Sequence, residues 1–343
     1  MQKNTSVTMK QVAKLAKVSV STVSHVINKT RFVDNSTQQR VLKAMAELSY
    51  HPNVIAQSLR RKRTNTVGLI ISDIANPFFP EVVRGIEKQL TKKRYSIILA
   101  NTDDDIEKEK QLTVLLYGKR VDGFIIVTSG GENKHINFLV QQKVPVVLLD
   151  RRIDELELDA ALVDNQKGAQ IITKHLIEVG HRRIGIITGP LVISTGKERL
   201  SGYLEALKEH ALPRDDELIK IGNFKVQSGH SLALELISLP STPTAILACN
   251  NMMGLGAMNA LQEKGIQVPA EMGLAIIDDL PWFRYMDPPL TVVAQPAFEL
   301  GETAAKLLLE RIGKEREEPK QVVLQVELRI RRSAGEIQMS MAG

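Results

Sequence analysis

From residue 64 onward, short runs of Val, Ile and Leu alternate with longer amphipathic stretches, and this alternation limits the possible folds. The apolar runs have the length of strands, and their continuous apolar character indicates strands that are buried on both faces. Strands of this kind joined by helices are typical of doubly wound parallel sheets. We expect strands at residues 67–71, 96–100, 123–127, 144–150 and 161–164, and again at 184–188, 219–222, 245–250, 274–278 and 291–295. The two series predict an α/β body of two doubly wound lobes.

The first 63 residues differ from this body in charge. They contain twelve Lys and Arg residues against two acidic residues, a net charge of +10. The remaining 280 residues carry 33 basic and 37 acidic side chains, a net charge of −4. A basic unit suits a nucleic-acid backbone, because each neutralised phosphate releases condensed counterions. The chain is therefore predicted to consist of two parts that meet two different partners.

The basic part is rich enough in apolar residues to fold. Apolar residues recur at helical spacing from Met9, the pattern breaks at residues 17–19, and it restarts with Ser19 as a cap for residues 20–28. A third amphipathic stretch covers residues 36–48. Four compact or polar side chains lie on the outer side of the second helix: Val20, Ser21, Thr22 and His25. Such a face can enter a major groove, although a plain three-helix bundle is the alternative.

A short segment links the two parts. Residues 54–61 follow Asn53 as a possible cap, and eight residues are too few for a helix that is stable alone in water. We expect this segment to be unfolded in the free protein and to become helical on DNA, beside its copy from a second subunit. The alternative is a flexible basic linker.

Polar and aromatic residues follow nearly every strand of the body. In doubly wound folds a ligand binds outside the carboxyl ends of the strands. Ten residues stand at or near these ends: Asn76, Phe78, Phe79, Asp150, Arg151, Arg199, Phe224, Asn250, Asp278 and Gln295. Carboxylates and guanidinium groups bond neighbouring hydroxyls, and Phe rings cover the CH patches of a sugar. The set is typical of a site for a neutral polyol.

Two short sequence motifs resemble those of a known family. Residues 9–13, MKQVA, and residues 18–28, VSVSTVSHVIN, resemble the DNA-binding headpiece of the LacI/GalR family of bacterial transcriptional regulators. The resemblance implies an all-α helix-turn-helix headpiece that contacts operator DNA through Val20, Ser21, Thr22, His25 and Arg31. It also implies a hinge helix that contributes Asn53, Ala56, Leu59 and Arg60, in which Leu59 wedges into a minor-groove base step.

The body is similar to the periplasmic sugar-binding proteins related to this family. Its ten strand-end residues match the ligand positions of the ribose-binding branch, which implies ribose or a related pentose as the effector. Ile193 stands where purine repressors have a base-reading Arg. The alternatives are a sugar acid such as gluconate or ketogluconate, or a carbon-catabolite regulator controlled by a phosphoprotein partner. Three features depart from the family pattern: the pair Asn250-Asn251, the pair Ile276-Ile277, and Trp282, which we expect at the pocket mouth.

The expected organisation follows from both arguments. We expect a headpiece at 8–51, a hinge at 52–63 and an effector domain at 64–343, with one lobe at about 64–163 and 294–321 and the other at about 164–293 and 322–335. Residues 333–343 lack a heptad pattern, so we expect a homodimer on a palindromic operator rather than a tetramer. The ligand acts either as inducer or as corepressor.

Several other classes are not expected. The longest apolar runs are far shorter than a membrane span, and the N-terminus lacks a signal-peptide pattern. The one cysteine, Cys249, gives neither a disulfide nor a multi-cysteine metal site. Residues 194–197 read S-x-x-K, but the accompanying motifs of serine enzymes are missing. We expect no enzyme activity, cofactor or metal, and a cytoplasmic location at the bacterial nucleoid.

Overall fold

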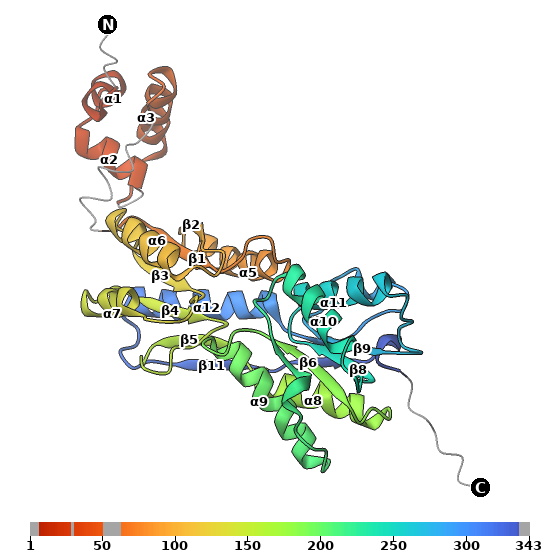
Figure 1. The fold of residues 1–343 in the computed structure, drawn as a ribbon. Helices are drawn as coiled ribbons and strands as arrows, with labels where there is room; N and C mark the ends of the chain where they lie inside the picture. Colours follow the sequence, from red (N-terminus) through yellow and green to blue (C-terminus); the bar gives the residue numbers. More distant parts are fainter. Residues whose placement is uncertain (1–6, 29–30, 51–62, 336–343) are drawn as a thin grey trace, which may run out of the picture. The chain divides into compact units, whose positions relative to one another are not determined.

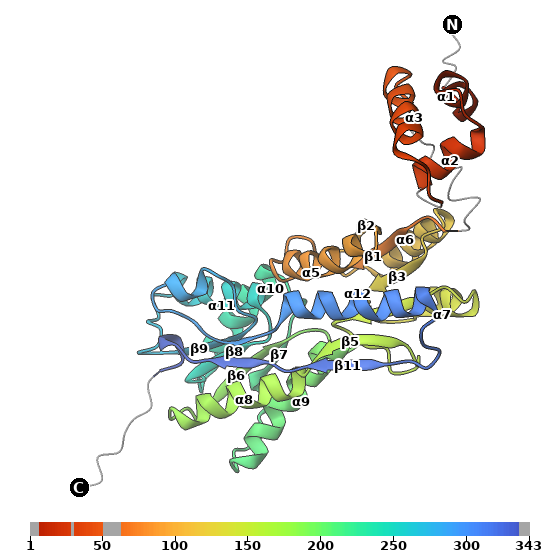
Figure 2. The same ribbon diagram turned by 180° about the vertical axis from the view of Figure 1, so that it is seen from behind.

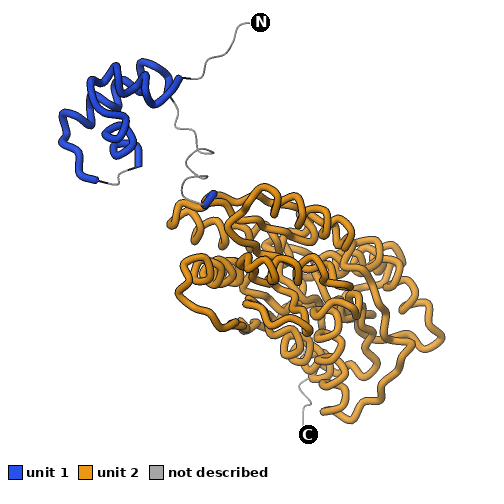
Figure 3. Tube along the Cα trace, turned by 90° about the vertical axis from the view of Figure 1, so that its left-hand side faces the viewer, with its two compact units in different colours: residues 1–64 blue, residues 65–343 orange. Residues whose placement is uncertain are grey.

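The computed structural model describes residues 7–28, 31–50 and 63–335. The chain divides into two compact units, residues 1–64 and residues 65–343 (Figure 3). The expected hinge contacts at Asn53, Ala56, Leu59 and Arg60 lie outside the described residues.

The first unit contains three helices, α1 (Met9–Ala16), α2 (Val20–Asn28) and α3 (Asn35–Glu47). Each begins where the sequence offers a cap. Thr8 forms a capping box with Gln11, the Ser19 hydroxyl accepts the Thr22 amide at 3.0 Å, and Asp34 accepts the Thr37 amide at 2.9 Å. Buried Val12, Val23 and Val41 come from the three helices in turn and form one core. The predicted three-helix unit is therefore present in this part of the chain.

The second unit contains two six-stranded sheets. The first has the order β11-β5-β4-β3-β1-β2 and the second has the order β12-β10-β9-β8-β6-β7. The first sheet consists of β1 (Thr66–Ile71), β2 (Ser96–Asn101), β3 (Gly123–Ile126), β4 (Val146–Leu149), β5 (Asp159–Val163) and β11 (Gln321–Leu324). The second consists of β6 (Ile184–Thr188), β7 (Ile219–Ile221), β8 (Ala245–Ala248), β9 (Gly273–Ile277), β10 (Thr291–Ala294) and β12 (Glu327–Arg329). The recorded pairings are parallel except that of β12 with β10.

Helices cover both faces of each sheet (Figures 1 and 2). In the first lobe, α5 (Phe78–Lys92) and α12 (Ala297–Gly313) cover one face, and α6 (Ile106–Gly118) and α7 (Lys134–Gln141) cover the other. The second lobe uses α8 (Asn165–Glu178), α9 (Ser194–Glu209), α10 (Val226–Ile237) and α11 (Asn251–Glu263). Helices α5 and α12 touch closely, since a Cβ on Gly85 would lie 2.0 Å from the Phe298 carbonyl oxygen.

The chain crosses between the lobes three times: between β5 and α8, between β10 and α12, and between β11 and β12. The predicted position of the last crossing, between residues 321 and 322, is too early in the chain. Residues 322–324 were expected in the second lobe, but they belong to β11 and pair with β5 of the first sheet. Two short strands near the C-terminus also raise the predicted five strands of each lobe to six, because an edge strand of three or four residues leaves little periodic signal.

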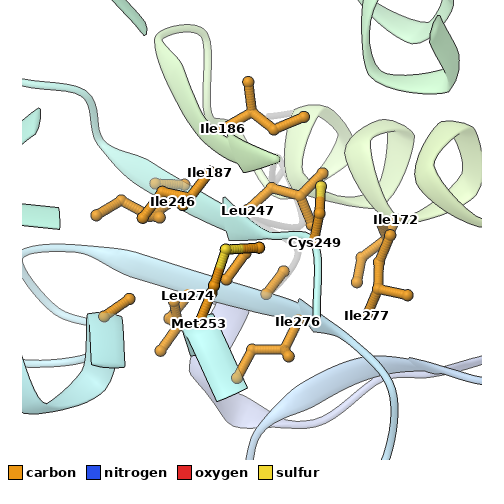
Figure 4. Close-up of a cluster of buried hydrophobic side chains, with 14 of the residues drawn as sticks. Ile172, Ile186, Ile187, Ile246, Leu247, Cys249, Met253, Leu274, Ile276 and Ile277 are labelled. Atoms are coloured by element: carbon orange, nitrogen blue, oxygen red, sulfur yellow. The ribbon is translucent and has the colours of Figure 1, made fainter. Parts of the chain in front are cut away.

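Each lobe has its own core. Figure 4 shows part of the second one, where side chains from neighbouring strands, among them Ile187, Leu247 and Ile276, pack with Met253 of α11. The free cysteine, Cys249, is fully buried in this cluster, so it packs as a small apolar residue. Among the described residues, no helix combines the length and apolar character that crossing a membrane requires.

Candidate functional site

One cavity lies at the carboxyl ends of strands from both lobes. Its lining is polar and aromatic: Ser72, Asp73, Asn76, Phe78, Phe79, Asp104, Asp150, Arg151, Thr195, Arg199, Phe224, Asn250, Asp278 and Gln295. The structure thus brings all ten of the strand-end residues together around a common space. The lining residues surround about 390 Å³ of space, including a part that opens to solvent.

Three of the lining residues have a left-handed backbone. Asp150 after β4, Phe224 after β7 and Asp278 after β9 have φ angles of 64°, 64° and 80°. Residues other than glycine pay a conformational cost in this region, and such costs concentrate at functional sites. The turns direct the chain away from the sheet at the point where each side chain meets the cavity.

Two buried carboxyl groups face two buried arginines in the cavity. Burial raises the pKa of Asp150 to about 6, although the positive charges of Arg199 and Arg151 oppose the rise. Burial also raises the pKa of Asp278, against the opposing charge of Arg199 and a hydrogen bond from the Gln295 amide. Burial therefore favours the protonated form of both carboxyl groups, and the positive charge of Arg199 opposes this effect.

The arginines are fixed from behind. Arg199 donates from Nε to the Asn165 side-chain oxygen at 2.9 Å and from Nη1 to the Cys249 carbonyl at 2.5 Å. Arg151 donates from Nη1 to Asp104 at 2.6 Å and to the Thr128 carbonyl at 2.8 Å. Holding a guanidinium by such contacts leaves its remaining N–H groups directed at a ligand without a further entropy loss.

A deeper pair of side chains supports the Arg151 contact. Glu109 of α6 is fully buried, accepts the Ser129 amide at 2.5 Å, and pairs with His135 of α7 at 2.7 Å. Ser129 directly follows Thr128, whose carbonyl holds Arg151. The loop after β3 is therefore fixed to two helices behind the cavity.

Aromatic rings form the apolar part of the lining. Phe78 and Phe79 begin α5 and pack edge to face, with ring centroids 5.2 Å apart. Phe224 comes from the second lobe, and the Arg151 guanidinium carbon lies 5.4 Å from the centre of its ring. Gly189 leaves room for this ring, because a Cβ there would lie 2.0 Å from Phe224. Rings from both lobes can thus cover the apolar patches of one ligand.

Several buried polar atoms of the lining lack a hydrogen-bond partner. Within the described part of the chain, these include Ser72 Oγ, Asp150 Oδ1, Arg151 Nε and Gln295 Oε1. An unpaired buried polar group is costly, and binding sites are where proteins tolerate it. Acceptors and a donor gathered in one cavity suit a ligand that carries several hydroxyl groups.

The predicted set of ten residues omits four lining residues: Ser72, Asp73, Asp104 and Thr195. Asp73 was visible after the first strand, but Asp104 and Thr195 lie in a turn and at a helix start, where polar residues are ordinary. Trp282 was expected at the pocket mouth, and the structure contradicts this. Trp282 is 46% exposed, precedes the 3₁₀ helix Phe283–Tyr285, and is not part of the lining.

The two adjacent asparagines have separate roles. Asn250 caps α11 by accepting the Met253 amide at 2.8 Å, and it donates to the Phe224 carbonyl at 3.0 Å. Asn251 is fully buried and donates to Asn76 of the first lobe at 2.9 Å. An Asn at position 251 thus supplies a donor between the lobes, which an aspartate could not.

The first unit presents the expected face of α2. Val20 is 41% exposed and Ser21 is exposed, whereas Thr22 and His25 are half-buried. Arg31 is exposed beyond the end of the helix. The Ser21 and Thr22 hydroxyls lie within 2.7 Å and 2.8 Å of the Ser19 hydroxyl. These side chains share the N-terminal half of one helix, the part that a helix-turn-helix unit directs at base edges.

Comparison with known proteins identifies the class. The family described as "Bacterial regulatory proteins, lacI family" matches residues 8–53, and "Periplasmic binding proteins and sugar binding domain of LacI family" matches residues 64–332. The chain therefore belongs to the LacI family, as a DNA-binding transcriptional repressor with a sugar-binding domain.

The individual relatives agree with this assignment. The chain is 38% identical over 306 residues to the HTH-type transcriptional repressor PurR of Aliivibrio salmonicida, covering 89% of this chain and 92% of that protein. It is 37% identical over 318 residues to the ribose operon repressor of Haemophilus influenzae, covering 93% and 96%. The solved structure of the lac repressor dimer bound to operator and the anti-inducer ONPF matches with a TM-score of 0.86 and 28% identity, covering 96% and 100%.

Proposed function

We propose that this repressor binds ribose or a related pentose in the cavity between its lobes, and that the sugar controls its affinity for a palindromic operator. The observation that carries the proposal is the convergence of Phe rings, two arginines and two carboxylates on one cavity with unpaired polar atoms. Phe78, Phe79 and Phe224 would cover the ring of the sugar. The other members of the proposed effector set would bond its hydroxyls: Asn76, Asp150, Arg151, Arg199, Asn250, Asp278 and Gln295.

The charge balance supports a neutral sugar over a sugar acid. Asp104 is paired with Arg151, and Asp73 is paired with Lys225 at 2.5 Å. This leaves Asp150 and Asp278 opposite Arg199, an excess of one negative charge when both are ionised. A ligand carboxylate would meet repulsion here, whereas hydroxyl groups donate hydrogen bonds to both acids.

The similarity to PurR repressors makes a purine the main alternative effector. Ile193 is 4% exposed and packs against the position of Gly130, so it offers no hydrogen bond to a base. The chain lacks an arginine at this point, and with it one donor that could read a purine base. These features favour the pentose.

A ligand screen on the full-length protein tests the effector. Thermal shift and titration calorimetry would compare ribose, other pentoses, gluconate, ketogluconate and hypoxanthine. We expect saturable binding of ribose or another pentose and none of the sugar acids. Tight binding of hypoxanthine without pentose binding would refute the proposal.

We further propose that two copies bind DNA together through residues 8–51 and a hinge at 52–63. Val20, Ser21, Thr22, His25 and Arg31 would contact the major groove, and Asn53, Ala56, Leu59 and Arg60 would contact the minor groove as paired hinge helices. The effector would change the operator affinity only by its differential affinity for the two arrangements, typically 1–3 kcal/mol. The effector domain would occupy 64–343, and the protein would act in the bacterial cytoplasm at the nucleoid.

Measurements of DNA binding test this second part. Replacing Leu59 by Ala should weaken binding to a specific operator much more than binding to unrelated DNA, because the wedge acts only where the duplex kinks. Operator affinity should also fall steeply with salt. Equal weakening on both DNAs, or a flat salt dependence, would count against the proposed interface.

A further inference from the structure

The two lobes are joined around the cavity by polar contacts that no ligand is needed to make. Lys225 of the second lobe lies 2.5 Å from Asp73 of the first, and Asn251 donates to Asn76 at 2.9 Å. On another part of the rim, Arg152 pairs with Glu198 at 3.1 Å. Each bridging pair includes a lining residue or its direct neighbour in sequence. Bringing the lobes together therefore makes these contacts and completes the cavity in the same movement.

The Lys225–Asp73 pair is the strongest of these contacts. The Asp73 side chain is 11% exposed and the Lys225 side chain is 31% exposed, so solvent screens the pair only in part. Asp73 also accepts the Ala75 amide at 2.9 Å, which fixes the carboxylate. The charge of Lys225 further helps to lower the pKa of Asp103, after the larger effect of hydrogen bonds from Lys108 and Asn101. Lys225 of the second lobe thus lies close to two acidic residues of the first lobe, Asp73 and Asp103.

Lys225 directly follows Phe224, whose strained backbone has to be held in place by neighbouring contacts. Phe224 holds its ring in the cavity with a left-handed backbone at φ 64°. The Lys225 amide donates to Asn223 at 3.1 Å, and Asn250 donates to the Phe224 carbonyl at 3.0 Å. The turn is thus fixed from the second lobe by these bonds and from the first lobe by Asp73.

We propose that Lys225 and Asp73 form a clasp that holds the lobes closed and keeps Phe224 against the ligand. Both are positioning residues that set how long the effector stays bound. The kinetic consequence rests on the proposed sugar-binding function, whereas the effect on closure does not. Breaking the clasp should speed release, because the contact between the lobes has to open before a bound ligand can leave.

The first experiment measures closure in the full-length protein without ligand. Spin labels would be placed on cysteines introduced at exposed Lys143 and Lys208, one in each lobe, with labelled subunits diluted by unlabelled ones. The native Cys249 is fully buried, and burial raises its pKa to about 12, so it does not compete for the label. Lys225→Gln and Asp73→Asn should each shift the distance distribution toward longer values.

Two further variants make this measurement specific. Lys220→Gln is the matched control, because Lys220 pairs with Glu235 within the second lobe at 3.2 Å, and it should leave the distribution unchanged. Lys225→Arg keeps the charge and should restore the wild-type distribution. An unchanged distribution in Lys225→Gln would overturn the clasp, whatever the protein binds.

The second experiment measures ribose kinetics by stopped flow. The dissociation rate should rise about tenfold in Lys225→Gln, and the double variant with Asp73→Asn should be no faster than the single ones, since one contact is lost in each. Equal dissociation rates in Lys225→Gln and wild type would overturn the proposed control of release. If wild type ignores ribose while the label distances still shift, the sugar assignment fails and the clasp stands.

Discussion

The two lobes share one strand order, although the edge strand is parallel in the first and antiparallel in the second, and they differ in the side chains that they bring to the cavity. Each has six strands in the same order, and strand β4 of the first lobe corresponds to β9 of the second. Each of these strands ends in a left-handed aspartate, Asp150 or Asp278. The first lobe contributes two rings, Phe78 and Phe79, together with Arg151, whereas the second contributes one ring, Phe224, together with Arg199 and Asn250. The comparison teaches that the scaffold fixes where a side chain meets the ligand and leaves its chemistry free.

The arginines differ in the same way. Arg151 of the first lobe shares its charge with Asp104, at 2.6 Å. Arg199 of the second lobe is held by an amide oxygen and a carbonyl, and its charge opposes the pKa rise of both cavity aspartates. The second lobe therefore supplies most of the compensating positive charge. Four predictions test this asymmetry.

The largest effect is expected for Arg199→Ala compared with Arg151→Ala. Loss of Arg199 leaves two buried carboxyl groups without their main positive partner, and truncating such a buried charged pair costs roughly 2–5 kcal/mol. Ribose affinity should fall on the order of 100-fold or more in calorimetry, and less in Arg151→Ala. Arg214→Ala is the control, because Arg214 forms only an exposed pair with Asp216, and it should leave the ribose affinity unchanged.

Both arginine variants should still bind operator DNA in the absence of sugar, as measured by fluorescence anisotropy. Equal losses of ribose affinity in the two variants would remove the proposed asymmetry. Loss of operator binding in both would place these residues in the fold rather than in the effector site.

The second prediction concerns stability. Burial raises the pKa of Asp150 from 3.8 to about 6, and a rise of this size corresponds to at most about 3 kcal/mol against the charged form. The folded protein holds the extra proton between about pH 4 and 6, so this group lowers stability as pH rises through that window. Asp150→Asn should therefore unfold at a higher temperature than wild type at pH 7 in calorimetric melts. No gain at pH 7 would show that the charge is well compensated.

The third prediction is the pH dependence of binding. Hydroxyl groups donate to the ionised Asp150, so a bound sugar favours the charged form and lowers its pKa. Ribose affinity should rise about tenfold from pH 5 to pH 7 and then level off. Calorimetry in buffers of different ionisation enthalpy should detect proton release near pH 6. The slope should disappear in Asp150→Asn; a slope that persists there would assign it to Asp278 or another group.

The smallest effect is expected from the rings. Phe224→Leu removes the ring beneath Arg151, and a contact of this kind contributes roughly 0.5–2 kcal/mol. Ribose affinity should fall about threefold to tenfold, with a smaller loss in Phe78→Leu, whose ring has Phe79 beside it. A larger loss in Phe78→Leu would mean that the first lobe supplies the main stacking surface.

Much of this architecture could be predicted from sequence, because its signals are local. Ser19 predicts the start of α2 because its hydroxyl can cap the helix, and apolar runs such as that at β4 predict buried strands. Ligands of doubly wound folds bind at the carboxyl ends of the strands, and this rule predicted that Asn76 and Gln295, more than two hundred residues apart, lie at one cavity. Periodicity and topology were sufficient for these features.

The remaining features depend on contacts that have no local signal. Asp104 and Thr195 reach the cavity from a turn and from a helix start, and only the packing of the lobes shows this. The left-handed backbone of Asp150, Phe224 and Asp278 is uncommon for residues other than glycine, and the sequence around these positions does not predict it. Trp282 was expected at the pocket mouth because it follows β9 closely in sequence, but it precedes the 3₁₀ helix Phe283–Tyr285 and lies outside the cavity lining.

The three crossings have a consequence for synthesis on the ribosome. The first lobe needs α12 and β11, so it lacks a covering helix and an edge strand until residue 324 has emerged. The second lobe needs β12, which ends at Arg329. Neither lobe can be finished while the other is still being translated, and a nascent chain exposes unpaired strand edges until almost its last codons. Premature stop codons anywhere before residue 320 should therefore yield products for proteases and chaperones rather than half-functional repressors.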